Sequence, residues 1–312
     1  MIFPRYLPFY LRNHSQLIMF ISVIIPTYNR AGYLRQSLKS LVSQNFSKDK
    51  FEVIVVDDGG QDNLAAVIGD FSGKLDLKYF KEKHLNICHA RNVGIKNARG
   101  DILVFFDDDA VADSHWLESI SRIMEKENIV VGRGKPLNDN MWQYFAPHYD
   151  RGDQPIEIST IWECNLAVKK AVFAAIGLFD EKIGWGHEGN EFARRCQGKY
   201  RLMYYPEMII FHDYAFGLIN YFLKQKKFGE KLIYLKINGI KNIFELFFNY
   251  KKIKGAGEGQ PRKIASPSGT RGRNDKLQRL PFFRKLIIKI VAKIGSGFHF
   301  YGSVVGYFKY KK

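Results

Sequence analysis

The chain has 312 residues, of which 46% are hydrophobic and 25% are charged, and this balance excludes a wholly disordered or fibrous protein. The formal net charge is +17, but it is unevenly distributed. Residues 1–219 contain 26 basic and 27 acidic side chains, whereas residues 220–312 contain 22 basic and 4 acidic ones. The positive charge therefore belongs to the last part of the chain.

Short β-branched runs alternate with segments of helical periodicity in the first part of the chain. This alternation predicts an α/β fold with a mainly parallel sheet flanked by helices. The expected strands are 21–25, 51–56, 75–79 and 102–106, and the expected helices are 31–44, 62–71, 87–98, 168–176 and 188–197. Residues 132–160 are expected to be irregular.

The composition changes beyond residue 215. We expect a main domain at 19–215, preceded by an aromatic and basic segment at 1–18. A basic, amphipathic helical extension is expected at 216–312, with a flexible linker at about 254–279.

The sequence predicts no membrane span. The apolar run 17–25 is too short for a span and leads into a predicted strand, while lysines and a histidine interrupt the apolar stretch 286–308. The three cysteines are too few and too scattered for a disulfide framework, which favours a reducing compartment.

The densest polar group is Asp107-Asp108-Asp109, directly after a predicted buried strand. Adjacent carboxylates repel one another, so a fold that gathers them at a strand end is expected to supply a cation. Oxygen ligands of this kind favour Mg²⁺ or Mn²⁺. The three residues alone leave a solvated acidic turn as an alternative.

Polar residues also follow the first two predicted strands. Asp57-Asp58-Gly59-Gly60 suits a turn in which carboxylates meet a base or a ribose, although an ordinary Asp-Gly turn has the same pattern. Residues 26–30 add an aromatic ring, a hydroxyl and a guanidinium. Because ligands of such sheets bind at the carboxyl ends of the strands, these loops together predict a nucleotide-diphosphate site.

Five segments together resemble the successive blocks of glycosyltransferase family 2, whose members have the Rossmann-like GT-A fold. They are SVIIPTYNR (22–30), VIVVDDGGQD (53–62), ARNVGIKNARGDILVFFDDDA (90–110), NLAVKKAVFAAIGLFDE (165–181) and GWGHEGNE (184–191). The resemblance covers about residues 20–215. It implies an inverting transferase that uses a nucleotide-sugar donor, with a UDP-sugar expected, and a divalent cation, Mn²⁺ or Mg²⁺.

The resemblance also implies roles for single residues. Asp109 would bind the metal directly, and Asp107 would be the other outer carboxylate of the DxD pattern. His212 would be a further ligand, although a purely structural role stays open. The donor site would comprise Pro26, Thr27, Tyr28, Arg30, Asp57, Asp58, Arg91, Asp107, Asp108 and Trp185, with Asp58 on the base and Asp108 facing the ribose or sugar. For Trp185, stacking on the sugar and packing in the core both stay open.

The position of the catalytic base departs from the family pattern. Members carry an acidic pair at the start of the last of these helices, where this chain reads Glu188-Gly189. Aligned on Trp185, the base position falls on Gly189, which has no side chain; aligned on Arg194, it falls on Glu188. We therefore predict Glu188 as the base, with Glu191 as the fallback, and a catalytically weak sugar-nucleotide-binding protein as the alternative.

Aromatic residues are interleaved with lysines in residues 220–312. This composition is typical of helices that lie on an anionic bilayer. We expect a cytoplasmic protein attached peripherally to the inner face of the membrane, with a glycan or lipid-linked acceptor. No nucleic-acid partner is expected, because no recognised nucleic-acid module is present. A nucleotidyltransferase is the second enzymatic hypothesis, although the glycine-rich triphosphate loop is missing.

Overall fold

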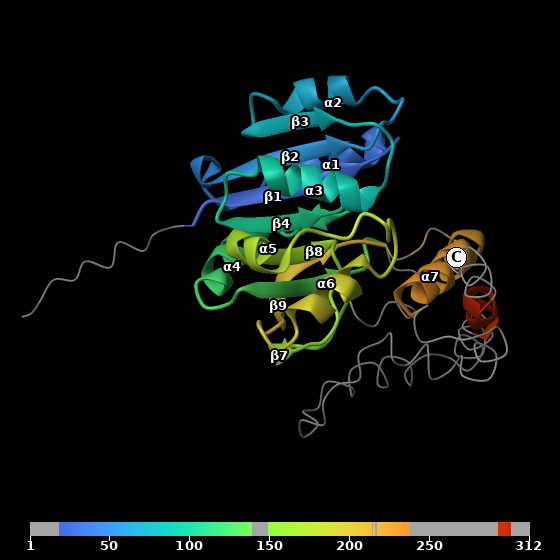
Figure 1. Ribbon diagram of the computed structural model, residues 1–312. Coiled ribbons are helices and arrows are strands. Elements are labelled where there is room, and N and C mark those ends of the chain that lie inside the picture. The colour runs from blue at the N-terminus through green and yellow to red at the C-terminus, as the bar shows by residue number, and fades with distance from the viewer. Residues whose placement is uncertain (1–18, 139–148, 214, 216, 237–292, 301–312) are drawn as a thin grey trace, which may run out of the picture.

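The computed structural model describes residues 19–138, 149–213, 215, 217–236 and 293–300. In this part of the chain one sheet has the order β3-β2-β1-β4-β8-β6-β9-β5, and β7 pairs with β9 (Figure 1). The strands are β1 (Ile21–Thr27), β2 (Phe51–Asp57), β3 (Leu77–Lys81), β4 (Ile102–Phe106), β5 (Val111–Ala112), β6 (Ile129–Lys135), β7 (Ile156–Glu157), β8 (Asn165–Lys169) and β9 (Met203–Phe211). The helices are α1 (Ala31–Val42), α2 (Leu64–Phe71), α3 (Ile87–Asn97), α4 (Trp116–Met124), α5 (Lys170–Ile176), α6 (Glu188–Cys196) and α7 (Leu218–Lys236).

The first half of the sheet is parallel, as the sequence predicts. Strand β1 pairs with β2 and β4, and β2 pairs with β3, all in parallel. Every residue of β1, β2 and β4 is buried. Parallel strands covered on both faces read as continuous apolar runs, which is why these strands were predictable to within two residues.

The second half of the sheet is mixed, and two predictions are wrong there. Val168 belongs to β8, which pairs antiparallel with β4 and β6, so the predicted helix begins only at Lys170. Both Leu166 and Val168 are fully buried, and pairing on both sides of β8 overrides the helical periodicity of this segment. The stretch 132–160, which was expected to be irregular, contains part of β6 and all of β7. Strand β6 pairs with one edge of β9, and β7 pairs with the other edge of β9.

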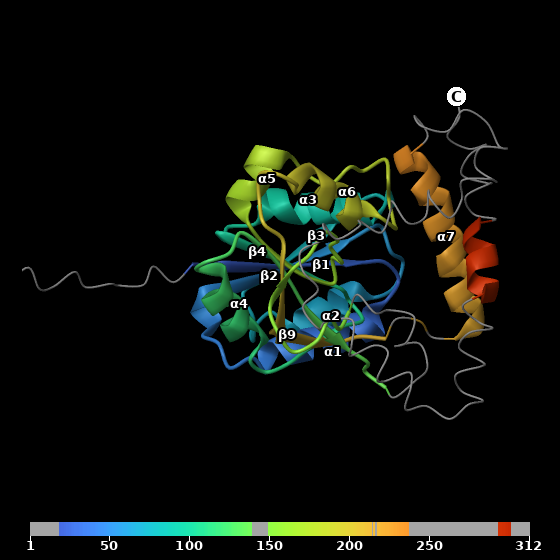
Figure 2. The ribbon, with the colours of Figure 1, turned by 90° about the horizontal axis from the view of Figure 1, so that it is seen from below.

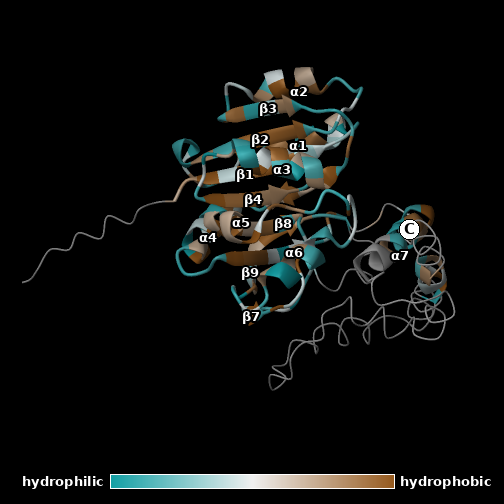
Figure 3. Cartoon of the chain, viewed as in Figure 1, coloured by the Kyte–Doolittle hydropathy of each residue, from teal (hydrophilic) through white to brown (hydrophobic). Residues whose placement is uncertain are grey.

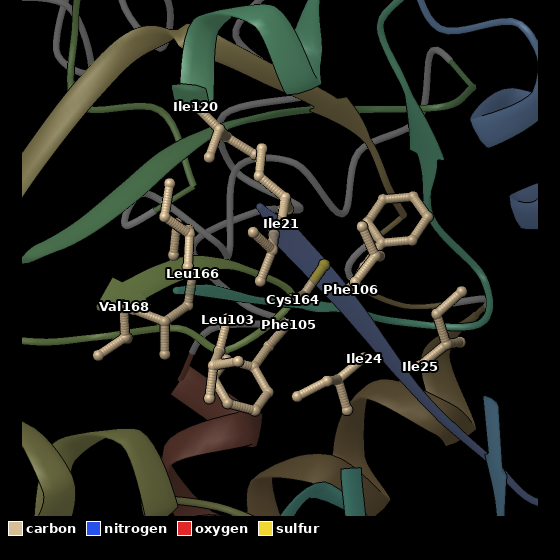
Figure 4. Close-up of a cluster of buried hydrophobic side chains, with 14 of the residues drawn as sticks. Ile21, Ile24, Ile25, Leu103, Phe105, Phe106, Ile120, Cys164, Leu166 and Val168 are labelled. Atoms are coloured by element: carbon tan, nitrogen blue, oxygen red, sulfur yellow. The ribbon is translucent and has the colours of Figure 1, made fainter. Parts of the chain in front are cut away.

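Helices cover both faces of the sheet. Helices α3, α5 and α6 lie on one face, and α1, α2 and α4 lie on the other (Figure 2). Figure 3 shows the hydrophobic residues concentrated in the central strands. Figure 4 shows Phe105 of β4 among the buried side chains of this core. Its ring packs edge-on against Phe173 and Phe179, with ring centroids 5.8 and 5.3 Å apart. Each such buried side chain contributes about 1.5–3 kcal/mol, so the core fixes the strand ends that carry the polar loops.

Helix α7 lies beyond the carboxyl ends of the parallel strands, beside a short helix formed by residues 293–300 (Figures 1 and 2). The rings of Phe222 and Phe298 stack at 4.8 Å and join the two helices. Of the helices described, none has the length and apolar character that crossing a bilayer requires. The predicted segment 1–18 and the predicted linker lie outside the described residues, so the domain boundaries stay a prediction.

Candidate active site

Three loops meet at the carboxyl-terminal edge of the parallel strands. They follow β1, β2 and β4, and hydrogen bonds connect them directly. The Asp58 amide donates to the Thr27 carbonyl (2.9 Å), and Arg30 reaches Asp108 and Asp109. The structure therefore brings the polar groups of the three predicted loops together in one site.

Helix α1 holds the acidic loop from one side. The Ser37 hydroxyl lies 2.7 Å from the carbonyl oxygen of Asp108 and 2.6 Å from that of Ala110. Ser37 is completely buried on the same face of α1 as Leu34 and Leu38. The sequence analysis missed this residue, although a serine on the apolar face of an amphipathic helix is a signal that its hydroxyl has a partner.

Asp108 is directed into the protein. One carboxylate oxygen accepts a hydrogen bond from the Thr27 hydroxyl (2.7 Å), and the other pairs with Arg30 (2.9 Å). Burial raises the pKa of Asp108 to about 7, although the Arg30 guanidinium opposes the shift. In this structure both oxygens of Asp108 hold Thr27 and Arg30 in place, and its contact with the donor stays a prediction.

Asp109 lies between two nitrogen groups. Its carboxylate is 2.7 Å from the Arg30 guanidinium and 3.1 Å from Nε2 of His212, which follows β9. Burial opposes ionisation, yet His212 and Arg30 outweigh it and hold the pKa of Asp109 below its ordinary value. Asp109 is therefore held as a carboxylate, the form that binds a cation.

The residues next to Asp109 fit a divalent cation. Oxygen and nitrogen atoms of Asp107 and His212 lie within 4.8 Å of each other and of the Cys164 thiol. His212 Nδ1 is buried and has no hydrogen-bond partner among the described residues, so this ring nitrogen is a candidate ligand atom. Burial raises the pKa of the Cys164 thiol, so Asp107 and His212 supply the oxygen and nitrogen ligand atoms of this cluster. Asp109, which the resemblance implies as the direct ligand, lies at Nε2 of the same His212 ring.

Asp57 and Pro26 form part of the framework on the nucleoside side. The Asp57 carboxylate accepts hydrogen bonds from the Gly60 amide (2.6 Å) and the Tyr79 hydroxyl (2.9 Å). Pro26 is a buried residue of β1 paired with Val56. Both residues were expected in the donor site, and here they fix the shape of its loops.

Asp58 lies beside a stacked pair of aromatic rings. Its carboxylate accepts from the Leu85 amide (2.9 Å) and lies 3.0 Å from His84 Nδ1. The His84 ring stacks on Tyr28, with centroids 4.1 Å apart and planes at 19°. Tyr28 and His84 are both well exposed, which makes this pair a platform for a flat base. The sequence analysis missed His84 because it precedes the helix-cap motif of α3 and belongs to no quoted block.

Arg91 of α3 connects the two ends of the site. Its guanidinium is 2.9 Å from Glu188 and 3.5 Å from Asp107, and both Arg91 and Glu188 are buried. Burial lowers the pKa of Arg91, but the charges of Glu163, Glu188 and Asp107 reverse that effect and raise it. The predicted base Glu188 is therefore a member of a buried ion pair.

Glu163 belongs to the same acidic group, although the sequence analysis did not single it out. Burial and the charge of Glu188 raise the pKa of Glu163 to about 8, against the opposing effect of Arg91. It is only partly buried. The described structure thus places a second carboxylate, which belongs to no recognised motif, beside Arg91.

The other two candidates on this side have partners outside the acidic group. Both Glu191 oxygens lie 2.8 Å from the Arg195 guanidinium, and Arg195 also donates to carbonyls at the end of α5. Trp185 packs against Phe228 of α7, with ring centroids 4.9 Å apart. In this structure Glu191 and Trp185 thus contact Arg195 and Phe228, and their roles as fallback base and donor contact stay predictions.

Helix α7 adds a cation to the site. Burial lowers the pKa of Lys224, and the charges of Asp109 and Asp107 oppose that shift, so its ammonium group lies within electrostatic range of the acidic loop. No motif marks Lys224, because it is one of many lysines in the basic extension. Its place beside the acidic loop suits an anionic ligand held between α7 and the sheet.

Solved structures share this architecture. A mannosyltransferase from Pyrobaculum calidifontis, solved with GDP-Man and Mn2+, matches with a TM-score of 0.62 and 15% identity, over 95% of this chain and 89% of that one. S. aureus TarS 1-349, solved with UDP-GlcNAc, matches with a TM-score of 0.53 and 17% identity, over 94% and 92% of the two chains. The fold is the GT-A fold, as predicted; at such identities the likeness shows the fold alone.

The sequence gives a closer assignment. Residues 22–173 match glycosyl transferase family 2, so this part of the chain belongs to that family. The chondroitin synthase of Pasteurella multocida (strain Pm70) is 35% identical over 222 residues, which are 57% of this chain and 23% of that protein. The validoxylamine A glucosyltransferase of Streptomyces hygroscopicus is 26% identical over 213 residues, 56% of this chain and 50% of that protein. The chain thus spans about a quarter to a half of the length of these two relatives.

Proposed function

We propose that the chain transfers a sugar, with inversion, from a nucleotide-diphosphate donor to a hydroxyl of a glycan or a lipid-linked acceptor. The observation that carries this proposal is the meeting of Asp58, Asp109 and Arg91 at one edge of the sheet. Family membership and neighbours solved with UDP, UDP-GlcNAc or GDP-Man support a nucleotide sugar as the donor. A UDP-sugar is the first candidate.

The site divides into parts that match the parts of such a donor. The Tyr28 and His84 rings would hold the base, with Asp58 as its hydrogen-bond acceptor. Arg30 and Lys224 would contact the diphosphate, since both cations border the acidic loop. Each contact uses a group whose charge or shape is complementary to that part of the donor.

Asp107, Asp109 and His212 would hold Mn²⁺ or Mg²⁺, which would neutralise charge on the departing diphosphate. The protein contributes the rest of the electrostatics through fixed cations. Arg30 and Arg91 are anchored by carboxylates, so they would not need to reorganise as negative charge develops on the leaving group.

A panel of UDP- and GDP-sugars tests the proposal through release of the free nucleoside diphosphate. We expect release with at least one donor in the presence of Mn²⁺, loss of that release with EDTA, and a loss of about 100-fold or more in Asp109→Asn. The anomeric configuration of the product, read by NMR, tests inversion. Pyrophosphate formation would indicate a nucleotidyltransferase, and donor binding without turnover would indicate a binding protein.

We also propose that the basic residues after position 219 attach the protein to the inner face of the membrane. Each basic residue near an anionic surface contributes about 1 kcal/mol, and this part of the chain has a large excess of them. Cosedimentation with vesicles containing phosphatidylserine should fall as salt is raised from 50 to about 500 mM. Equal binding to neutral vesicles, or no binding at low salt, would contradict this attachment.

A further inference from the structure

In the alignment on Trp185, Gly189 lies where the family pattern puts the side chain of the base, and the carboxylate of Glu163 fills that space. A Cβ atom built on Gly189 would lie only 2.1 Å from Oε1 of Glu163 and 2.8 Å from its Cδ. Real Cβ atoms essentially never approach another atom so closely. The Glu163 carboxylate therefore lies directly against the backbone of Gly189, in the first turn of α6.

The conformation of Gly189 does not itself require glycine. Its φ is outside the positive range that disfavours other residues, and it lies in the first helical turn, where an acidic side chain is stabilising. The nearest atoms that exclude a side chain belong to Glu163 and to the Ile161 carbonyl, 2.9 Å away. The Glu163 carboxylate therefore occupies the space that a side chain at position 189 would need.

The other carboxylates near this turn, those of Glu188 and Glu191, form ion pairs with arginines. Glu188 pairs with Arg91 at 2.9 Å, and only 5% of its side chain is exposed. Glu191 is paired with Arg195 through both oxygens. Glu163 is partly exposed and forms no ion pair within 4.0 Å among the residues that the structure describes. It precedes Cys164, whose thiol borders Asp107 and His212, and the charges of Glu188, Arg91 and Asp107 all act on its carboxylate.

We propose that Glu163 is the catalytic base of the transfer, supplied from the loop before β8 in place of the carboxylate missing at Gly189. This inference rests on the proposed function. The acceptor hydroxyl gives its proton to Glu163 while its oxygen bonds to the anomeric carbon. The electron pair of the anomeric C–O bond leaves with the nucleoside diphosphate, and the proton later passes from Glu163 to water. Glu188 and Arg91 are positioning residues in this scheme.

Substitutions that remove the carboxylate at position 163 and restore one at position 189 test the inference. We expect Glu163→Gln to lower kcat about 10²–10⁴-fold, the usual worth of a general base, with the KM of the donor changed less than threefold. The control Glu157→Gln makes the same chemical change at an exposed site on β7 and should leave both parameters unchanged. The double variant Glu163→Gly with Gly189→Asp should regain at least tenfold in kcat over Glu163→Gly alone. The kcat of this double variant should stay below that of the wild type, because the aspartate side chain introduced at position 189 would still be close to the Ile161 carbonyl.

Unfolding temperatures test the position of the Glu163 carboxylate independently of its role as the base. Gly189→Asp should lower the Tm in the wild-type background and much less in the Glu163→Gly background, because the second change removes the colliding carboxylate. Equal Tm losses in both backgrounds would overturn the placement of Glu163. Full kcat in Glu163→Gln, with donor turnover intact, would overturn its role as base. Absence of turnover in the wild type with every donor would instead refute the proposed function, while the Tm comparison would still report on the placement.

Discussion

The ion pair of Arg91 and Glu188 allows the sharpest prediction about stability. The two groups are 2.9 Å apart, and only 3% and 5% of their side chains are exposed. Arg91→Met would leave Glu188 as an uncompensated buried charge, a change that typically costs about 3–5 kcal/mol. At roughly 2–4 °C per kcal/mol for a domain of this size, the Tm should fall by about 6–20 °C.

A double-mutant cycle distinguishes the ion pair from simple packing. Glu188→Gln removes the charge that Arg91→Met leaves unpaired, so the double variant should recover about 2 kcal/mol or more of the loss. Thermal unfolding, combined with urea titration, gives the free energy of unfolding of each variant. Losses that add without coupling would refute the ion pair as the source of the stability. Arg91 also faces Asp107, so we expect the double variant to bind UDP and Mn²⁺ more weakly than the wild type even where stability recovers.

Three further substitutions test separate parts of the site. Ser37→Ala should cost about 1–3 kcal/mol in urea unfolding, because it leaves buried carbonyls without their donor; a loss below about 0.5 kcal/mol would contradict that role. His84→Ala should weaken UDP binding in calorimetry by about 1 kcal/mol through lost stacking with Tyr28, and unchanged affinity would show that the base binds elsewhere. Burial lowers the pKa of His89, but hydrogen bonding to Glu181 outweighs burial and raises the pKa above 6.5. The folded protein therefore binds a proton at His89 more tightly than the unfolded chain does. The free energy of unfolding should then fall as the pH rises above 6.5. His89→Gln should flatten this dependence above pH 6.5, and an unchanged slope would assign it to other groups.

The parallel half of the fold was predictable because each of its strands carries its own signal. Strands such as β1 and β4 are buried on both faces and read as unbroken apolar runs. Strand β8 has no such signal, since the residues around Val168 also fit a helix. Its conformation depends on Asn165, whose amide bonds to the Met208 carbonyl of β9 and accepts from the Trp116 indole. Contacts of this kind join segments far apart in the sequence, and local periodicity does not report them.

The site shows the same division between local and distant signals. The acidic loop and the Asp58 turn were predictable because several polar residues follow an apolar strand directly. Glu163 was not, because its significance depends on Gly189, which lies on another element and is close to it only in the folded chain. The Gly189 departure from the family pattern was visible in the sequence, but only the structure shows which side chain occupies the vacant space.

The charges of the site also couple the binding of its two ligands. Four carboxylates, those of Asp58, Asp107, Asp109 and Glu188, lie along this edge with the cations of Arg30, Arg91 and Lys224. A nucleoside diphosphate alone would bring further negative charge to this group, and a divalent cation would offset it. Binding of diphosphate and cation must then be mutually favourable, by the same factor in either direction. Calorimetric titration of UDP with and without Mn²⁺ should show this coupling, and equal affinities would mean that Arg30 and Lys224 alone compensate the diphosphate.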